Sequence, residues 1–72
     1  MEEFKDRLRI LRKERGMTQK NVAELLDVTE RNVRSYEAGD RFPEIKGLFL
    51  LADHFDVSLD YLVGRSDIRE RR

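Results

Sequence analysis

Residues 18–43 read TQKNVAELLDVTERNVRSYEAGDRFP, and this stretch decides the fold. It predicts a helix that starts at Thr18, a tight turn at residues 27–28 and a second helix that starts at Thr29. Threonine suits both starts because its hydroxyl accepts a hydrogen bond from a free backbone N–H of the first turn. The first helix has a small residue, Ala23, at its centre, where two backbones can approach closely. Two short helices joined by such a turn predict a helix-turn-helix.

The outer face of the second helix is polar. In a helix-turn-helix the second helix enters the major groove of DNA with its N-terminal residues at the base edges. An arginine there can donate two hydrogen bonds to guanine and a glutamate can accept one from cytosine, although the arginine is otherwise only solvated and the glutamate also repels phosphates. The pattern therefore predicts double-stranded DNA as a partner. The outward residues are Thr29, Glu30, Arg31, Asn32, Arg34 and Ser35.

Composition excludes several classes of function. The 72 residues include no cysteine and one histidine, so a disulfide framework and a thiolate zinc site are excluded and little remains for acid–base chemistry. There is no glycine-rich phosphate loop either. We therefore expect no enzyme activity, no cofactor and no small-molecule ligand. No apolar run is long enough to span a membrane, and the charged start MEEFKDRLRI is unlike a secretory signal, which favours a cytoplasmic protein.

The charge balance is unusual for a protein that binds nucleic acid. Lysine and arginine together number 15, and so do aspartate and glutamate, which gives a formal net charge of zero. Domains that bind nucleic acid usually have a basic excess or a basic face. We therefore expect charges to be segregated on the surface, with an affinity that depends on fit in the groove more than on bulk attraction.

Two longer helices are expected on either side of the central stretch. The first covers about residues 2–15 and ends at Gly16, which suits the position after a helix. The other starts at Phe42–Pro43, because proline is tolerated in a first turn. Its apolar residues recur at helical spacing and predict a buried stripe. The residues of this stripe are Ile45, Leu48, Leu51, Ala52 and Phe55.

A fifth helix and a tail complete the expected organisation. The fifth helix covers about residues 58–63, and Gly64 ends it. The predicted fold is thus all-α, with five short helices in one domain over residues 1–64. The tail, residues 65–72, contains a single apolar side chain, Ile68. It cannot bury enough surface to order itself, so we expect it to be flexible unless it docks on the domain.

These residues resemble the lambda-repressor-like, Cro/C1-type helix-turn-helix domain, also called the xenobiotic-response-element family of bacterial regulators. Each matching element is weak alone, but the combination is specific and extends over about residues 4–64. The elements are LRxxRG at 11–16, TQ at 18–19, Ala23, YEAG at 36–39, Pro43, LA at 51–52 and VSLDYLVG at 57–64. The resemblance implies a compact five-helix domain. Asp27 and Asp56 depart from it, since glycine is usual in those two tight turns.

The resemblance also implies roles for individual residues. Arg12 and Glu37 match a pair that the family ties together as an internal salt bridge. Contacts to bases are expected from Glu30, Arg31 and Ser35, together with Arg34, which stands where a small residue is common. Contacts to the DNA backbone are expected from Gln19, Lys20, Thr29, Asn32 and Arg41.

The leading hypothesis is a sequence-specific transcriptional regulator, a repressor that binds a palindromic operator as a homodimer. One head this small recognises too few bases for a unique site, which favours a pair. Leu59, Tyr61, Leu62 and Val63 are the expected dimer interface, with Tyr61 and Val63 turned outward. The alternative is a protein-interaction module, such as an antitoxin or anti-repressor partner. The neutral charge and two leucines at expected exposed positions, Leu25 and Leu50, favour that alternative.

Overall fold

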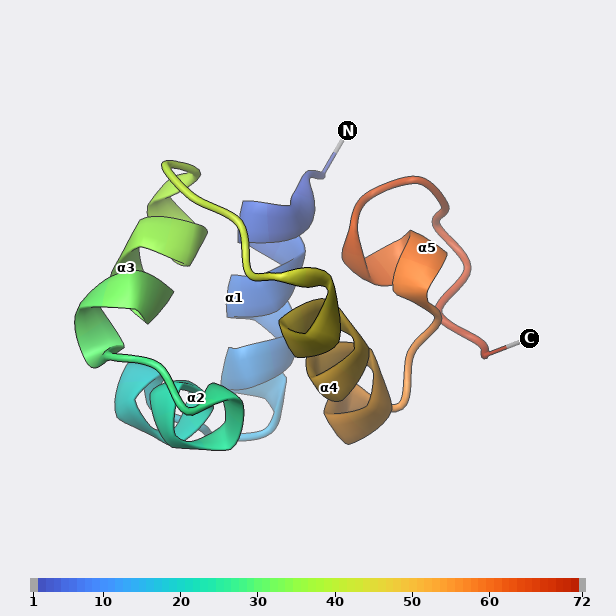
Figure 1. The fold of residues 1–72 in the computed structure, drawn as a ribbon. Helices are drawn as coiled ribbons and strands as arrows, with labels where there is room; N and C mark the ends of the chain where they lie inside the picture. The colour runs from blue at the N-terminus through green and yellow to red at the C-terminus, as the bar shows by residue number, and fades with distance from the viewer. Residues whose placement is uncertain (1, 72) are drawn as a thin grey trace.

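The computed structural model describes residues 2–71, and within that range it contains five helices and the expected all-α architecture. Figure 1 shows α1 at the centre, with α2 and α3 on one side and α4 and α5 on the other. The bounds are α1 (Phe4–Glu14), α2 (Gln19–Leu26), α3 (Glu30–Ala38), α4 (Ile45–Phe55) and α5 (Leu59–Leu62). Helix α1 packs on α3 and on α5, so it joins the two halves.

The core draws on every helix. One fully buried aliphatic side chain comes from each of them in chain order: Leu8, Val22, Val33, Leu51 and Leu62. Removing such a side chain from water contributes about 1.5–3 kcal/mol. No single pair of helices contains this core, so α3 keeps its position only when the whole domain is folded.

The tight turns have the backbone that the sequence predicts. Asp27, after α2, has a φ of 56°, and Asp56, after α4, has a φ of 53°, both in the left-handed region. Aspartate tolerates that region better than most residues, though less well than glycine. Thr18 also caps α2 as expected, because its hydroxyl accepts a hydrogen bond from the Asn21 N–H at 3.0 Å.

The start of α4 differs from the prediction. The helix begins at Ile45 after the N-cap residue Glu44, and Phe42 and Pro43 precede it outside the helix. Ile45 was expected in the buried stripe but is 59% exposed. Burial of the stripe increases along the helix, with Leu48 partly buried and Leu51 fully buried. The first turn thus lies at the edge of the core, where a side chain on the correct face has little to pack against.

The tail docks on the domain. We expected it to be flexible unless it did so. The Ser58 N–H donates to the Arg69 carbonyl at 2.8 Å, next to α5. The Arg69 guanidinium donates to both carboxylate oxygens of Glu14 at 2.9 and 2.8 Å, and Arg71 pairs with Asp53 at 2.5 Å. Polar contacts therefore hold a segment that has almost no apolar surface to bury.

Arg7 is a core residue that sequence reasoning missed. Only 2% of it is exposed, and its guanidinium lies 4.0 Å from the centre of the Tyr61 ring. It donates to the carbonyls of Tyr61 and Ser66 at 2.8 and 2.6 Å and to the Asp67 carboxylate at 2.8 Å. These acceptors satisfy the buried charge, which would otherwise be costly. Arg7 thus fastens both α5 and the tail to α1.

Candidate nucleic-acid interface

Helices α2 and α3 pack directly on each other and form the predicted helix-turn-helix (Figure 1). The inner face of α3 is held by Val33 and Tyr36, which are 0% and 5% exposed. The Thr29 hydroxyl caps its start by accepting from the Asn32 N–H at 3.1 Å. The core and the cap fix the direction of α3 and leave its outer face in solvent.

A buried ionic network braces α3 against α1 and α2. The Glu37 carboxylate accepts hydrogen bonds from Arg12 Nε at 2.6 Å and Arg12 Nη2 at 3.0 Å. Their side chains are 6% and 12% exposed, respectively. Gln19 Nε2 donates to the same carboxylate at 3.2 Å, and Arg12 Nη1 donates to the Met17 carbonyl at 3.0 Å. Arg12 and Glu37 form the ion pair that the resemblance implies. Together with Gln19 the pair connects α1, α2 and α3, and it also holds the segment before α2 through the Met17 carbonyl.

Three of the four residues expected at bases have exposed side chains. Arg31 is exposed and forms no salt bridge with any residue in the described range 2–71. Arg34 and Glu30 lie one turn apart and their charged atoms are 3.5 Å apart, with both side chains about half exposed. Such pairs contribute only about 0.3–0.5 kcal/mol, so a ligand can separate them easily. Ser35 is partly buried and less accessible.

The residues expected at the DNA backbone differ in exposure. Lys20, Thr29 and Arg41 are exposed, while Gln19 and Asn32 are partly buried. Gln19 contacts Glu37 through its amide nitrogen, as described above, so it already has a structural role. Arg41 Nη1 donates to the Asn32 side-chain oxygen at 3.0 Å, which brings these two predicted residues together.

Resolved pKa shifts lie away from this face. A hydrogen bond from the Glu3 backbone lowers the pKa of the Asp6 carboxyl. Hydrogen bonds from Arg69 lower the pKa of Glu14, and hydrogen bonds to Glu14 and Tyr61 raise the pKa of Arg69. These shifts report on the start of α1 and on the docked tail. They do not involve the outer face of α3.

The predicted orientation of α5 is wrong for Tyr61. Its side chain was expected outward but is 5% exposed, because the ring packs between the guanidinium groups of Arg7 and Arg69. Leu62 is fully buried, and Leu59 and Val63 are partly buried. With only four residues, α5 packs against both α4 and α1, so it has more than one buried face.

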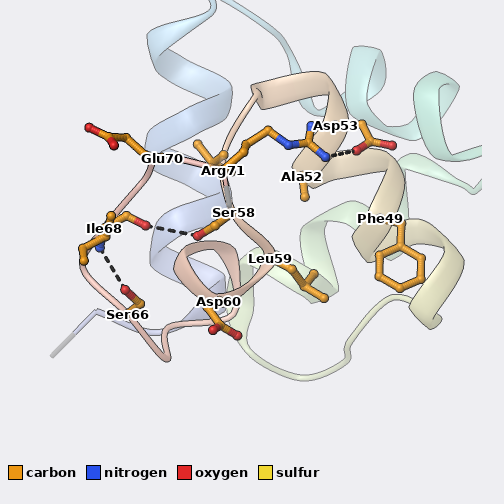
Figure 2. A pocket seen from close by; sticks show the side chains of 11 residues that line it. Phe49, Ala52, Asp53, Ser58, Leu59, Asp60, Ser66, Ile68, Glu70 and Arg71 are labelled. Carbon is orange, nitrogen blue, oxygen red and sulfur yellow. Dashed lines mark hydrogen bonds and ion pairs between the residues drawn. The ribbon is translucent and has the colours of Figure 1, made fainter.

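A hollow of about 450 Å³ lies between α4, α5 and the tail. Its lining combines polar and charged side chains with the apolar side chains of Phe49, Leu59 and Ile68 (Figure 2). Phe49 is 51% exposed and Ile68 is 46% exposed. Sequence reasoning missed Phe49, which is not among the residues of the predicted buried stripe and was given no role. An aromatic residue outside that stripe was the available signal.

Residues 2–71 contain neither a metal site nor a membrane-spanning helix. No group of histidine or acidic side chains there is arranged to hold a metal ion. No helix in the same range has the length and apolar character that a bilayer crossing requires.

The Helix-turn-helix family model matches residues 8–62, which is most of the chain. The HTH-type transcriptional regulator YqaE of Bacillus subtilis (strain 168) is 40% identical over 60 residues, covering 83% of this chain and 52% of that protein. The chain spans about half the length of the first curated relatives it matches. The matched family is one of transcriptional regulators and not of enzymes, in agreement with the expectation from composition.

Two solved structures have the same fold. A transcriptional regulator from Listeria innocua superposes with a TM-score of 0.82 and 43% identity, over 85% of this chain and 57% of that one. The P22 c2 repressor in complex with a synthetic operator also gives a TM-score of 0.82, over 92% of this chain and 100% of that one. Its identity is 21%, so that likeness shows the fold alone.

Proposed function

Because the chain belongs to the Cro/C1-type helix-turn-helix family, we propose that it is a regulator of transcription that binds a specific DNA sequence through α3. The observation that carries the proposal is the outer face of α3, where polar side chains project from a helix whose inner face and start are fixed. A rigid helix of this kind fits the major groove, which admits an α-helix. The Listeria innocua regulator supports the proposal at 43% identity.

Base recognition is assigned to the first turns of α3. Arg31, exposed and without an ion pair among residues 2–71, is available to donate two hydrogen bonds to guanine O6 and N7. Glu30 is available to accept from a cytosine amino group. Arg34 would have to leave Glu30 before it donates to DNA, at small cost. Ser35 is a weaker candidate because it is partly buried.

Contacts to phosphates are assigned to the residues that flank the outer face of α3 in the sequence. Lys20 of α2 and Arg41, which follows α3, supply exposed positive charge, and Gln19 has a second amide N–H beyond the one that it donates to Glu37. Thr29 offers its hydroxyl and the free backbone N–H groups at the start of α3, where an anion is favoured. Phosphate contacts fix the position of the protein on DNA without specifying sequence.

A homodimer is the assembly that we propose. Two-fold pairing places two recognition helices about 34 Å apart, one turn of DNA, and so matches a palindromic site. The surface assigned to the contact is now the apolar lining of the hollow in Figure 2, formed by Phe49, Leu59 and Ile68, because Tyr61 and Leu62 are buried within one chain. An operator occupied in this way within a promoter blocks transcription, which makes repression the proposed outcome.

Selection from a pool of random duplexes tests the proposal directly. The chain should enrich one sequence, arranged as an inverted repeat with half-sites about ten base pairs apart from centre to centre. Binding to that duplex should exceed binding to random DNA by at least about 10³-fold at physiological salt. Equal retention of all duplexes, or no retention at moderate salt, would refute sequence-specific binding. Enrichment of a single half-site would leave the DNA-binding role in place and refute the dimer.

A further inference from the structure

Asn32 and Arg41 are joined at the edge of the proposed DNA interface. Asn32 lies in the first turn of α3, and its backbone N–H is held by the Thr29 hydroxyl at 3.1 Å. Arg41 lies in the non-helical segment that follows α3, nine residues further along the chain, and its Nη1 donates to Asn32 Oδ1 at 3.0 Å. Both residues line a groove formed by α3, α4 and the end of α2. The amide therefore connects a fixed helix to a side chain on a loop.

The chemistry of the two groups fixes how the amide is turned. A guanidinium has only N–H donors, so the atom that faces Arg41 must be the amide oxygen. An asparagine that recognises adenine needs both of its polar atoms, since the oxygen accepts from N6 and the nitrogen donates to N7. The oxygen of Asn32 already accepts from Arg41, which occupies one of its two lone pairs and fixes the orientation of the amide. Recognition of adenine would have to use the remaining lone pair in that same orientation.

The same hydrogen bond restricts Arg41. An exposed arginine loses side-chain freedom when it binds, and this loss of conformational entropy weakens binding. A side chain that is already held near one position has less freedom to lose. Arg41 is exposed, and it forms no salt bridge with the residues that the structure describes, so its charge is available to an anion.

We propose that Asn32 is a positioning residue, which holds Arg41 beside the first turn of α3 so that the guanidinium meets a DNA phosphate. This inference rests on the proposed function and replaces the direct backbone contact expected for Asn32. Asn32 then contributes to affinity through Arg41 and contributes nothing to base choice.

A double-mutant cycle on DNA binding tests the coupling. The selected duplex is titrated with the parent, Asn32→Ala, Arg41→Ala and the double variant, each at several salt concentrations. Arg41→Ala should lower affinity by about tenfold, the loss of one charge-assisted hydrogen bond, and reduce the slope of log K against log salt by about one. Asn32→Ala should weaken binding by less and leave most of the slope, because the charge remains. Adding Asn32→Ala to Arg41→Ala should change affinity by less than about twofold if the coupling is complete.

Matched variants separate this role from a general effect on α3. Arg31, at the neighbouring position, should act independently of Asn32. The fold-losses of DNA affinity caused by Arg31→Ala and Asn32→Ala should therefore multiply in the double variant. Asn32→Asp keeps an oxygen that can accept from Arg41. Arg41→Ala should therefore lower DNA affinity more in the Asn32→Asp background than in the Asn32→Ala background. Melting curves confirm that each variant is folded, and Asn32→Leu, which also removes the acceptor for Arg41 but keeps the size of the side chain, serves if Asn32→Ala is not.

Three results would overturn the inference in different ways. If the fold-losses of affinity caused by Asn32→Ala and Arg41→Ala multiply in the double variant, the two residues are independent contacts. A changed consensus for Asn32→Ala would make Asn32 a base contact. If the parent itself enriches no sequence, the proposed function fails and the inference fails with it, whereas enrichment by the parent with independent losses rejects the inference alone.

Discussion

Replacing Glu37 with alanine should destabilise the domain severely. The side chain is 6% exposed and accepts three hydrogen bonds, two from Arg12 and one from Gln19. Without it, the Arg12 guanidinium keeps the Met17 carbonyl as its one described partner and stays largely buried. Breaking a buried pair in this way costs about 3–5 kcal/mol. A domain of 72 residues has a total stability of about 4–11 kcal/mol, so Glu37→Ala removes about a quarter of it or more.

Thermal and urea unfolding, followed by circular dichroism, measure this loss. A fall of 3 kcal/mol lowers the Tm of so small a domain by at least about 12 °C. The control Glu37→Gln keeps one oxygen acceptor and the shape of the side chain, so it should lose less. The double variant Arg12→Met with Glu37→Leu removes both charges and should recover most of the stability. A Glu37→Ala variant within about 1 kcal/mol of the parent would show that water reaches the pair and that the reasoning from burial fails.

Three further predictions follow from the site, the apolar surface and the docked tail. Arg31→Ala should weaken binding to the selected duplex by about 1–3 kcal/mol and relax one base position, and an equal loss on random duplexes in a competition assay would make Arg31 a phosphate contact. Phe49→Asp should produce a monomer in sedimentation, while Leu50→Asp, the next residue on α4 but facing the groove towards α2, should not; equal behaviour of the two argues against the assigned surface. Arg69→Ala should raise the pKa of Glu14 towards its ordinary value in an NMR titration. Because that pKa is lowered in the folded state, the Glu14 contribution to stability is present above the ordinary glutamate pKa and is lost as pH falls through the lowered value, a dependence that Arg69→Ala should abolish.

The helix-turn-helix could be predicted from the sequence because its determinants are local. Threonine caps depend on the next three residues, and the turn at Asp27 depends on the tolerance of one residue for a left-handed backbone. The Arg12–Glu37 pair is not local, since 25 positions separate its members. It was found through the resemblance to a family and not through periodicity.

The features that sequence reasoning missed depend on which elements end up adjacent. A helical wheel gives the correct face for Ile45 but not the edge of the core, and it places Tyr61 outward because it cannot include two arginines that pack on the ring. Arg7 looks like an ordinary exposed cation in the sequence. Apart from Glu2, its acceptors lie 54 to 60 positions further along the chain, so no local window contains them.

The outward side chains of α3 take no part in holding the domain together, and this separation affects how such a protein can change over time. Glu30 and Arg34 contact each other, and Arg31 contacts no charged partner in residues 2–71, while the core and the Arg7 fastening lie elsewhere. Substitutions at these three positions remove no buried contact. The preferred DNA sequence is therefore free to drift among descendants of one ancestor without a compensating change in the scaffold. Divergence of specificity can then proceed one residue at a time, with every intermediate still folded.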